Sequence, residues 1–166
     1  MRALPLLLLL PVLLLTGCST ADTGELRLVD TKGSVQLLRN EAWLRLPELM
    51  VKGDEQTDDS SVSCDDSGNS RSWRASTTAL INNSFAPRVA GVASDLVDSF
   101  VEQGWSADGE GELVTLTKEG SLAAIEVHAV EKTSDNRASI TITTTGPCVD
   151  TDGADSDEVR VLEGRK

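Results

Sequence analysis

The sequence predicts an α+β fold, a two-layer sandwich in which an N-terminal helix is followed by a β-α-β-β-β order with an antiparallel sheet. Three observations predict it. Apolar residues recur at three- and four-residue steps over 89–101, as in a helix that buries one face. Residues 71–81 alternate with a period of two, as in a half-buried strand. Three more strand-like segments with short turns then follow, which favours one sheet covered by helices on a single face.

The first seventeen residues have the pattern of an export signal. Arg2 supplies a positive charge, and 4–15 is almost wholly apolar. This stretch is shorter than the roughly 20 apolar residues that a membrane-spanning helix needs. It is therefore interpreted as the hydrophobic core of a secretory signal peptide.

Residues 15–18 read Leu-Thr-Gly-Cys and resemble the lipobox of bacterial lipoproteins. In that family the cysteine receives fatty acids such as palmitate, and the leader is removed just before it. The resemblance implies that 1–17 is a removed signal peptide and that Cys18 is the lipidation site. We expect 18–30 to be a lipidated tether that holds the protein on the extracytoplasmic face of the cell membrane.

The domain is expected to span 31–148 and to open with a helix. Thr31 or Ser34 can cap it, and Pro47 marks its end. Its apolar positions fall at three- and four-residue steps: Val35, Leu38, Ala42 and Leu46. The segment 53–70 that follows holds six acidic residues and no Lys or Arg, so a loop is predicted there.

The strand 71–81 and the helix 89–101 carry the strongest periodic patterns. Gly104 is placed to end this helix in the left-handed conformation, with Trp105 folding back on the last turn. The predicted strands after it are 112–118, 121–130 and 138–145, joined by turns at 119–120 and 134–136. In the last strand, Ile140, Ile142 and Thr144 share one face.

Two cysteines remain once Cys18 is assigned to lipid. Cys64 and Cys148 form an even pair in an exported chain, so a disulfide is predicted. It would tie the start of the strand 71–81 to the end of the strand 138–145. The acidic neighbours of Cys64 and the lack of a Cys-x-x-Cys spacing argue against a reactive thiol.

The last segment, 149–166, is predicted to be an acidic tail. Alternating Asp side chains in a Gly-containing loop make weak Ca²⁺ candidates of Asp150, Asp152, Asp155 and Asp157. The spacing departs from an EF-hand, and a solvated tail explains the same composition, so we predict no metal site and no cofactor.

Charge and composition exclude several classes of function. The chain of 166 residues has 27 acidic residues against 15 Lys and Arg, a formal net charge of −12. Nucleic-acid phosphates need basic residues to replace their counterions, so no nucleic acid is expected as a partner. An aromatic content of 3% without Tyr also disfavours base stacking.

The single histidine, His128, lies in a predicted strand with Glu126 two residues away on the same face. No Gly-x-Ser-x-Gly elbow or comparable nucleophile motif accompanies it. We therefore interpret His128 as a solvent-facing strand residue and expect no catalytic residues and no enzymatic activity.

Several landmarks along the chain together resemble those of small actinobacterial lipoproteins. They are Thr31-Lys32, Leu46-Pro47, Cys64 with Trp73, Gly104-Trp105 and Pro147-Cys148. The resemblance covers most of the chain after Cys18. It implies an envelope location and a small α+β domain, and it implies no reaction.

These observations predict a membrane-anchored cell-envelope lipoprotein without enzymatic activity. We expect it to bind a partner protein or another envelope component through the exposed sheet face or the acidic loops. The alternative is a carrier of a small ligand or Ca²⁺, with a pocket between the helices and the sheet lined by Trp43, Trp73 or Trp105.

Overall fold

The computed structural model describes residues 25–48, 54–82, 88–132 and 137–165. Within these residues the elements follow one another as α1 (Leu28–Leu44), β1 (Asp54–Ser63), β2 (Ser70–Asn82), α3 (Val89–Val101), β3 (Ser106–Asp108), β4 (Leu113–Thr117), β5 (Ala124–Val130), β6 (Arg137–Thr145), β7 (Val149–Asp150) and α4 (Asp157–Leu162). The predicted α+β class is confirmed.

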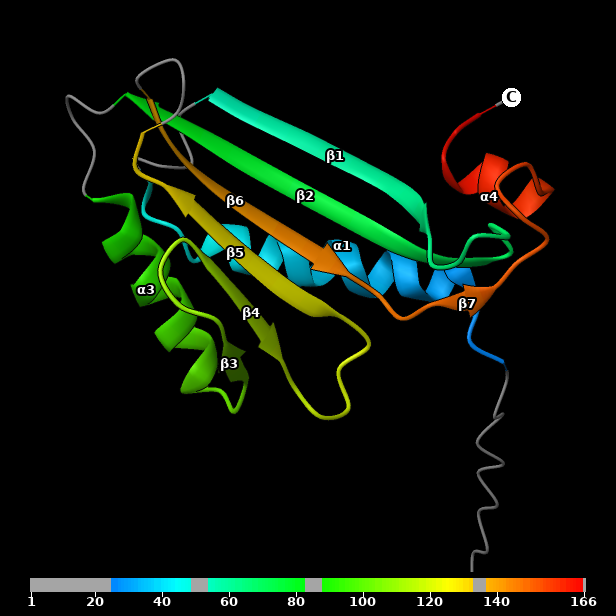
Figure 1. Ribbon diagram of the computed structural model, residues 1–166, viewed down its shortest axis with the longest axis horizontal. Helices are drawn as coiled ribbons and strands as arrows, with labels where there is room; N and C mark the ends of the chain where they lie inside the picture. The colour runs from blue at the N-terminus through cyan, green and yellow to red at the C-terminus, as the bar shows by residue number, and fades with distance from the viewer. Residues whose placement is uncertain (1–24, 49–53, 83–87, 133–136, 166) are drawn as a thin grey trace, which may run out of the picture.

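The strands form one antiparallel sheet in the order β1-β2-β6-β5-β4-β3, with β7 paired to the start of β2. The predicted meander is confirmed, since β4, β5 and β6 are neighbours in chain order. In Figure 1, α1 crosses behind β2 and β6, and α3 lies at the left, where it contacts mainly β5 and also β6, β4 and β3. The two long helices thus cover one face and leave the other open.

The buried faces of the strands meet these helices in one apolar layer. Every second residue of β2 is buried from Trp73 to Ala79, and on β6 the predicted face of Ile140, Ile142 and Thr144 is fully buried. Packing this layer removes several large apolar side chains from water, and each contributes roughly 1.5–3 kcal/mol to stability. The helix–sheet interface is therefore the core of the domain.

Helix α3 is the element that follows its sequence pattern most closely. Its bounds agree with the prediction, and its buried residues lie along one stripe. Gly104 adopts φ 85° and donates its N–H to the Val101 carbonyl, while the Trp105 N–H bonds to the Phe100 carbonyl. The rings of Trp105 and Phe100 meet edge to face at 5.4 Å. The predicted helix end is confirmed.

The first helix begins earlier than predicted, so the expectation of a tether over 18–30 is wrong for its last three residues. Leu28 is fully buried in the first turn. The Arg27 N–H donates to the Asp30 carboxylate at 3.2 Å, which satisfies an N-terminal donor without a Ser or Thr cap. Thr31, one of the two predicted caps, lies inside the helix and donates to the Leu28 carbonyl.

The prediction of a loop over 53–70 is wrong for most of its length. Residues 54–63 form β1, which pairs with β2 in continuous register from Asp54 opposite Leu80 to Ser63 opposite Arg71. Asp and Ser are disfavoured in strands, but β1 is an edge strand whose side chains are mainly exposed, and charged side chains are common there because they oppose pairing with another chain. Residues 64–69 form the turn.

The expectation that 149–166 is a solvated tail is also wrong. Val149 pairs with Arg71 in the sheet, and Val159 of α4 is fully buried against Trp73 and Leu28. The Ser156 side chain accepts from the Val159 N–H and caps this short helix. The C-terminal segment therefore closes the end of the core that α1 and β2 leave open (Figure 1).

The predicted disulfide between Cys64 and Cys148 is present, with 6.1 Å between its Cα atoms. It joins the turn after β1 to the connection between β6 and β7. Together with β7 it fastens the C-terminal segment to the start of β2.

Candidate functional site

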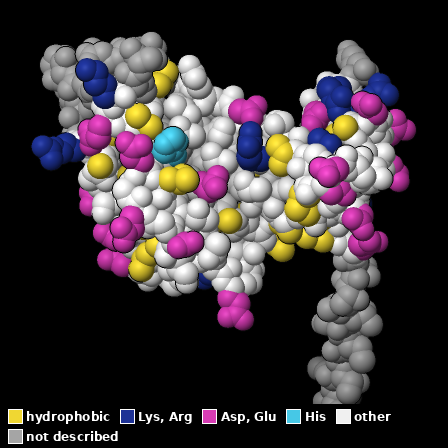
Figure 2. Space-filling view, in the orientation of Figure 1, with side chains coloured by type: hydrophobic (Ala, Val, Ile, Leu, Met, Phe, Trp, Pro, Cys, Tyr) yellow, Lys and Arg dark blue, Asp and Glu magenta, His cyan; other side chains and the backbone are white. Residues whose placement is uncertain are grey.

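The open face of the sheet is a broad polar surface built mainly from Ser and Thr. Side chains of β1, β2, β6, β5 and β4 form rows across it, one of which is Asp58, Ser76, Thr143, Glu126 and Thr115. Figure 2 shows this face, where white atoms predominate over charged and hydrophobic ones. The hydroxyls of Thr78 and Thr141 bond to each other at 2.8 Å. The surface offers many short hydrogen-bonding groups on a rigid scaffold.

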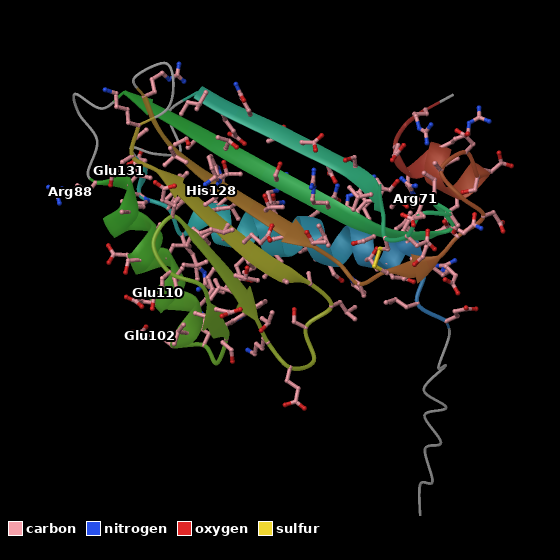
Figure 3. The ribbon with its side chains drawn as sticks, in the orientation of Figure 1. Arg71, Arg88, Glu102, Glu110, His128 and Glu131 are labelled. Carbon is pink, nitrogen blue, oxygen red and sulfur yellow. A yellow bond between two sulfur atoms is a disulfide. The ribbon has the colours of Figure 1, made fainter. Side chains whose placement is uncertain are left out.

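His128 lies on this open face and is exposed, as predicted (Figure 3). Its register neighbours are Thr141 on β6 and Leu113 on β4, and Glu126 is exposed two residues along the same strand. A nucleophilic site needs a base that a third group orients toward a nucleophile. Neither register neighbour is a carboxylate that would orient the imidazole.

An apolar cavity of about 270 Å³ lies between α3 and the sheet. It is lined by Ala90, Ala93, Ser94, Val97, Gly111, Val114 and Val127. Gly111 of the loop before β4 lines this cavity. At Gly109 of the same loop, which has φ 101°, an added Cβ would lie 2.6 Å from the Leu113 carbonyl oxygen. Only glycine fits this close approach without strain, and the sequence pattern did not indicate it.

None of the three tryptophans lines this cavity, contrary to the pocket predicted from Trp43, Trp73 or Trp105. Trp73 is fully buried and the other two are 8% exposed, all within the core. The space exists instead because α3 presents small residues, Ala90 and Ala93, to the sheet. Such space depends on which side chains face each other, which the pattern along one chain does not reveal.

The acidic residues of β1 divide between the two faces of the sheet. Asp59 points toward the helices, where its carboxylate accepts hydrogen bonds from Trp73 Nε1 and Gln36 Nε2. It therefore links β1, β2 and α1 through one side chain. Asp58, its neighbour, lies opposite Ser76 on the open face. Asp59 thus has a structural role, which the acidic composition of this segment did not indicate.

The four Ca²⁺ candidates do not converge. Asp155 pairs with Arg165 at 3.5 Å, and Asp157 begins α4. Asp150 and Asp152 line a shallow, open depression with Thr151 and Glu158. Within the ranges that the structure describes, no three His, Cys, Asp or Glu side chains gather in a way that could hold a metal ion. Asp155 and Asp157 instead take part in the structure of the C-terminal segment.

A polar cluster attaches this segment to the edge of the sheet. The Glu163 carboxylate accepts from the Ser61 N–H at 3.1 Å and from the Ser61 hydroxyl at 2.6 Å. The guanidinium of Arg71, which is 8% exposed, donates to the Ser61 hydroxyl and carbonyl oxygens (Figure 3). Lys32 of α1 donates to the Leu162 carbonyl and lies 4.4 Å from the centre of the Trp73 ring.

This cluster makes the attachment of α4 dependent on pH. Partial burial raises the pKa of Glu163, but the hydrogen bonds from Ser61 and the charge of Arg165 outweigh it and hold the pKa below its ordinary value of 4.5. A carboxyl whose pKa is lower in the folded state adds stability that is complete above its unfolded pKa and is lost as the pH falls through the folded one.

We therefore expect Glu163→Gln to lower the melting temperature at neutral pH, and the gap to the parent protein to close progressively below about pH 4.5. Thermal unfolding followed by circular dichroism across this range measures the gap. Glu158→Gln, an exposed carboxylate in the first turn of α4, is the control and should open a smaller gap. A gap for Glu163→Gln that stays constant to pH 2 would contradict the assignment.

Cys18 and the leader lie outside the described residues, so lipidation remains a prediction from the sequence. Within the described part of the chain, no helix is both long and apolar enough to cross a bilayer. Comparisons with protein-family models, with curated proteins and with solved structures find no match to this chain.

Proposed function

We propose that this chain is a lipid-anchored cell-envelope lipoprotein whose domain binds a partner protein, or another envelope component, through the open face of the sheet. The domain acts by binding and performs no reaction. Cys18 carries the lipid, and the domain stands on the extracytoplasmic face of the cell membrane.

Two features support the location. The lipobox pattern at 15–18 follows an apolar leader of the right length. The disulfide between Cys64 and Cys148 belongs to an oxidising compartment, because the cytosol keeps such pairs reduced. Two or three acyl chains give stable anchoring where one gives only reversible binding.

The observation that carries the binding function is the uncovered sheet face. Helices cover one side of the sheet, whereas rows of Ser and Thr with Glu126, His128 and Arg74 occupy the other. Rigid strands that present short side chains lose little conformational entropy when a partner docks on them. Glu126 lies in the middle of this face, paired with Thr143 and Thr115.

Affinity capture with the folded domain as bait, applied to solubilised membranes, tests this proposal. We expect one envelope component to be retained by the parent domain and by Glu102→Lys, but to be lost with Glu126→Lys. Both substitutions reverse an exposed charge, and Glu102 lies at the end of α3, away from the open face (Figure 3). Equal retention by both variants would exclude the open face as the binding surface.

The cavity between α3 and the sheet supports a second candidate, a carrier of a small apolar ligand. Its lining is almost entirely aliphatic, with Ser94 as the one hydroxyl-bearing side chain. The same purification separates the two candidates. Mass spectrometry of an organic extract of the purified domain would find a bound small molecule if the second candidate holds, and a protein partner would be absent.

A further inference from the structure

A second surface, distinct from the open sheet face, lies where the described chain begins. Two adjoining depressions of about 400 and 260 Å³ share Ser121, Leu122 and Ala123 of the connection between β4 and β5. We call them together the Leu122 groove, and its apolar lining includes Leu26, Leu37, Leu38, Leu122, Ala123 and Pro147. The groove therefore runs from Leu26, two residues before α1, to the middle of that helix.

The rim of the groove is unusually apolar for a chain of this charge. Leu37 is 72% exposed and Leu122 is 44% exposed, and Leu44 lies two turns beyond Leu37 on the same side of α1 with 79% exposure. Figure 2 shows hydrophobic side chains gathered along the lower edge of the molecule, beside the point where the described chain begins. Contiguous exposed apolar surface of this kind marks an interaction site.

The position of Leu26 indicates what covers the groove. Leu26 lies eight positions after Cys18 in the chain. At about 3.3–3.6 Å per residue, that length spans at most about 29 Å even when fully extended. If Cys18 holds acyl chains in a bilayer, the end of the groove at Leu26 is confined to within this distance of the membrane surface. A bilayer is thus the apolar surface that such an anchor would hold next to the groove.

We propose that the Leu122 groove rests on the lipid bilayer, so that the domain lies with this edge on the membrane and does not tumble freely about its anchor. The proposal depends on the anchor in the proposed function. Lys118 and Glu119 in the same connection are charged and exposed, which places the contact at the depth of the headgroups. The open sheet face then stands beside the bilayer and stays accessible to partners.

The distribution of acidic residues fits this orientation. In Figure 1 the acidic strand β1 forms the edge of the sheet opposite the connection between β4 and β5. An anionic membrane surface repels carboxylates within about one Debye length, so the carboxylate row of β1 is favoured on the side away from the lipid. Glu41 also lines the groove, but its carboxylate is paired with Arg45. Glu55, Asp58 and Asp59 on β1 would lie on the side away from the membrane.

The test uses the mature lipidated protein in phosphatidylcholine vesicles whose acyl chains carry bromine near the headgroup end. We expect the fluorescence of Leu122→Trp to be quenched about twofold relative to vesicles without bromine, because interfacial apolar groups lie roughly 5–10 Å into the boundary. Leu113→Trp is the matched control, since Leu113 is 49% exposed at the opposite end of β4. The signal of the three native tryptophans is subtracted using the parent protein.

Quenching of Leu122→Trp with little change in Leu113→Trp supports the orientation. Equal quenching of the two variants, or none in either, overturns it while the anchor stands, provided that the protein co-floats with the vesicles. If the protein neither co-floats nor incorporates labelled palmitate, the anchor fails, and with it both the proposed location and the orientation.

Discussion

Replacing both Cys64 and Cys148 by Ser is expected to lower the free energy of unfolding by about 4.5 kcal/mol. The two cysteines are 84 residues apart, and a cross-link that closes so long a loop removes many conformations from the unfolded chain. Since small domains have a total stability of about 5–15 kcal/mol, this loss is expected to leave the domain marginal.

Urea denaturation followed by circular dichroism measures this change as a lower midpoint. Thiol reduction of the parent protein provides the control, because it should move the midpoint to that of the double variant. The double variant should also expose α4 first, since the bridge fastens the connection that leads to β7 and α4. An unchanged midpoint in the double variant would show that the β7 pairing and α4 contacts alone fasten the C-terminal segment.

Trp73→Ala is expected to cost about 3–5 kcal/mol of stability, as for other large-to-small changes of a buried aromatic residue. The Trp73 side chain is fully buried, with 0% of its surface exposed to solvent. It packs in the apolar cluster that includes Leu28 and Val159. The Lys32 ammonium makes a cation–π contact with the Trp73 ring, and Trp73 Nε1 donates a hydrogen bond to the Asp59 carboxylate. Four segments, α1, β1, β2 and α4, therefore meet at this one side chain.

A short series of variants separates these contributions. Trp73→Phe keeps most of the buried area and removes one hydrogen bond to an exposed carboxylate, so a loss of about 1 kcal/mol is expected. Asp59→Ala leaves a buried indole N–H without its acceptor and should cost about 1–3 kcal/mol. Asp58→Ala, which changes the neighbouring residue on the open face, should stay within about 0.5 kcal/mol. Equal losses for Asp58→Ala and Asp59→Ala would contradict the structural role of Asp59.

The parts of the fold that sequence reasoning predicted correctly are those where periodicity follows burial. In α3, the residues Val89, Leu96 and Phe100 fall on the stripe that contacts the sheet, so its bounds could be read from the pattern. The same holds for β2 and β6, whose alternate residues are buried. One-sided burial leaves a regular signal in the sequence because each residue's face follows from its position.

The errors arose where long-range contacts override local preference. Strand β1 has the composition of a loop, and only its pairing with β2 makes it a strand. Helix α4 is six residues long and too short to be stable alone, so its packing through Val159 stabilises it. The early start of α1 follows from burial of Leu28, which no capping pattern indicates.

The candidate surfaces were only partly predictable. The exposure of His128 and its position on the same face as Glu126 followed from strand alternation. The cavity under α3 and the Leu122 groove depend on residues from separate elements, such as Val97 with Val127 and Leu37 with Leu122. These pairings exist only after folding, so the sequence alone could not reveal them.

The carboxylates along β1 have a consequence for how neighbouring molecules share a membrane. Copies held in one bilayer in the same orientation would approach one another sideways at high local density. Two such edges facing each other would bring rows of negative charge together, and this repulsion, together with the short length of β3 at the other edge, opposes sheet-to-sheet polymerisation. We expect crowded copies to remain separate particles.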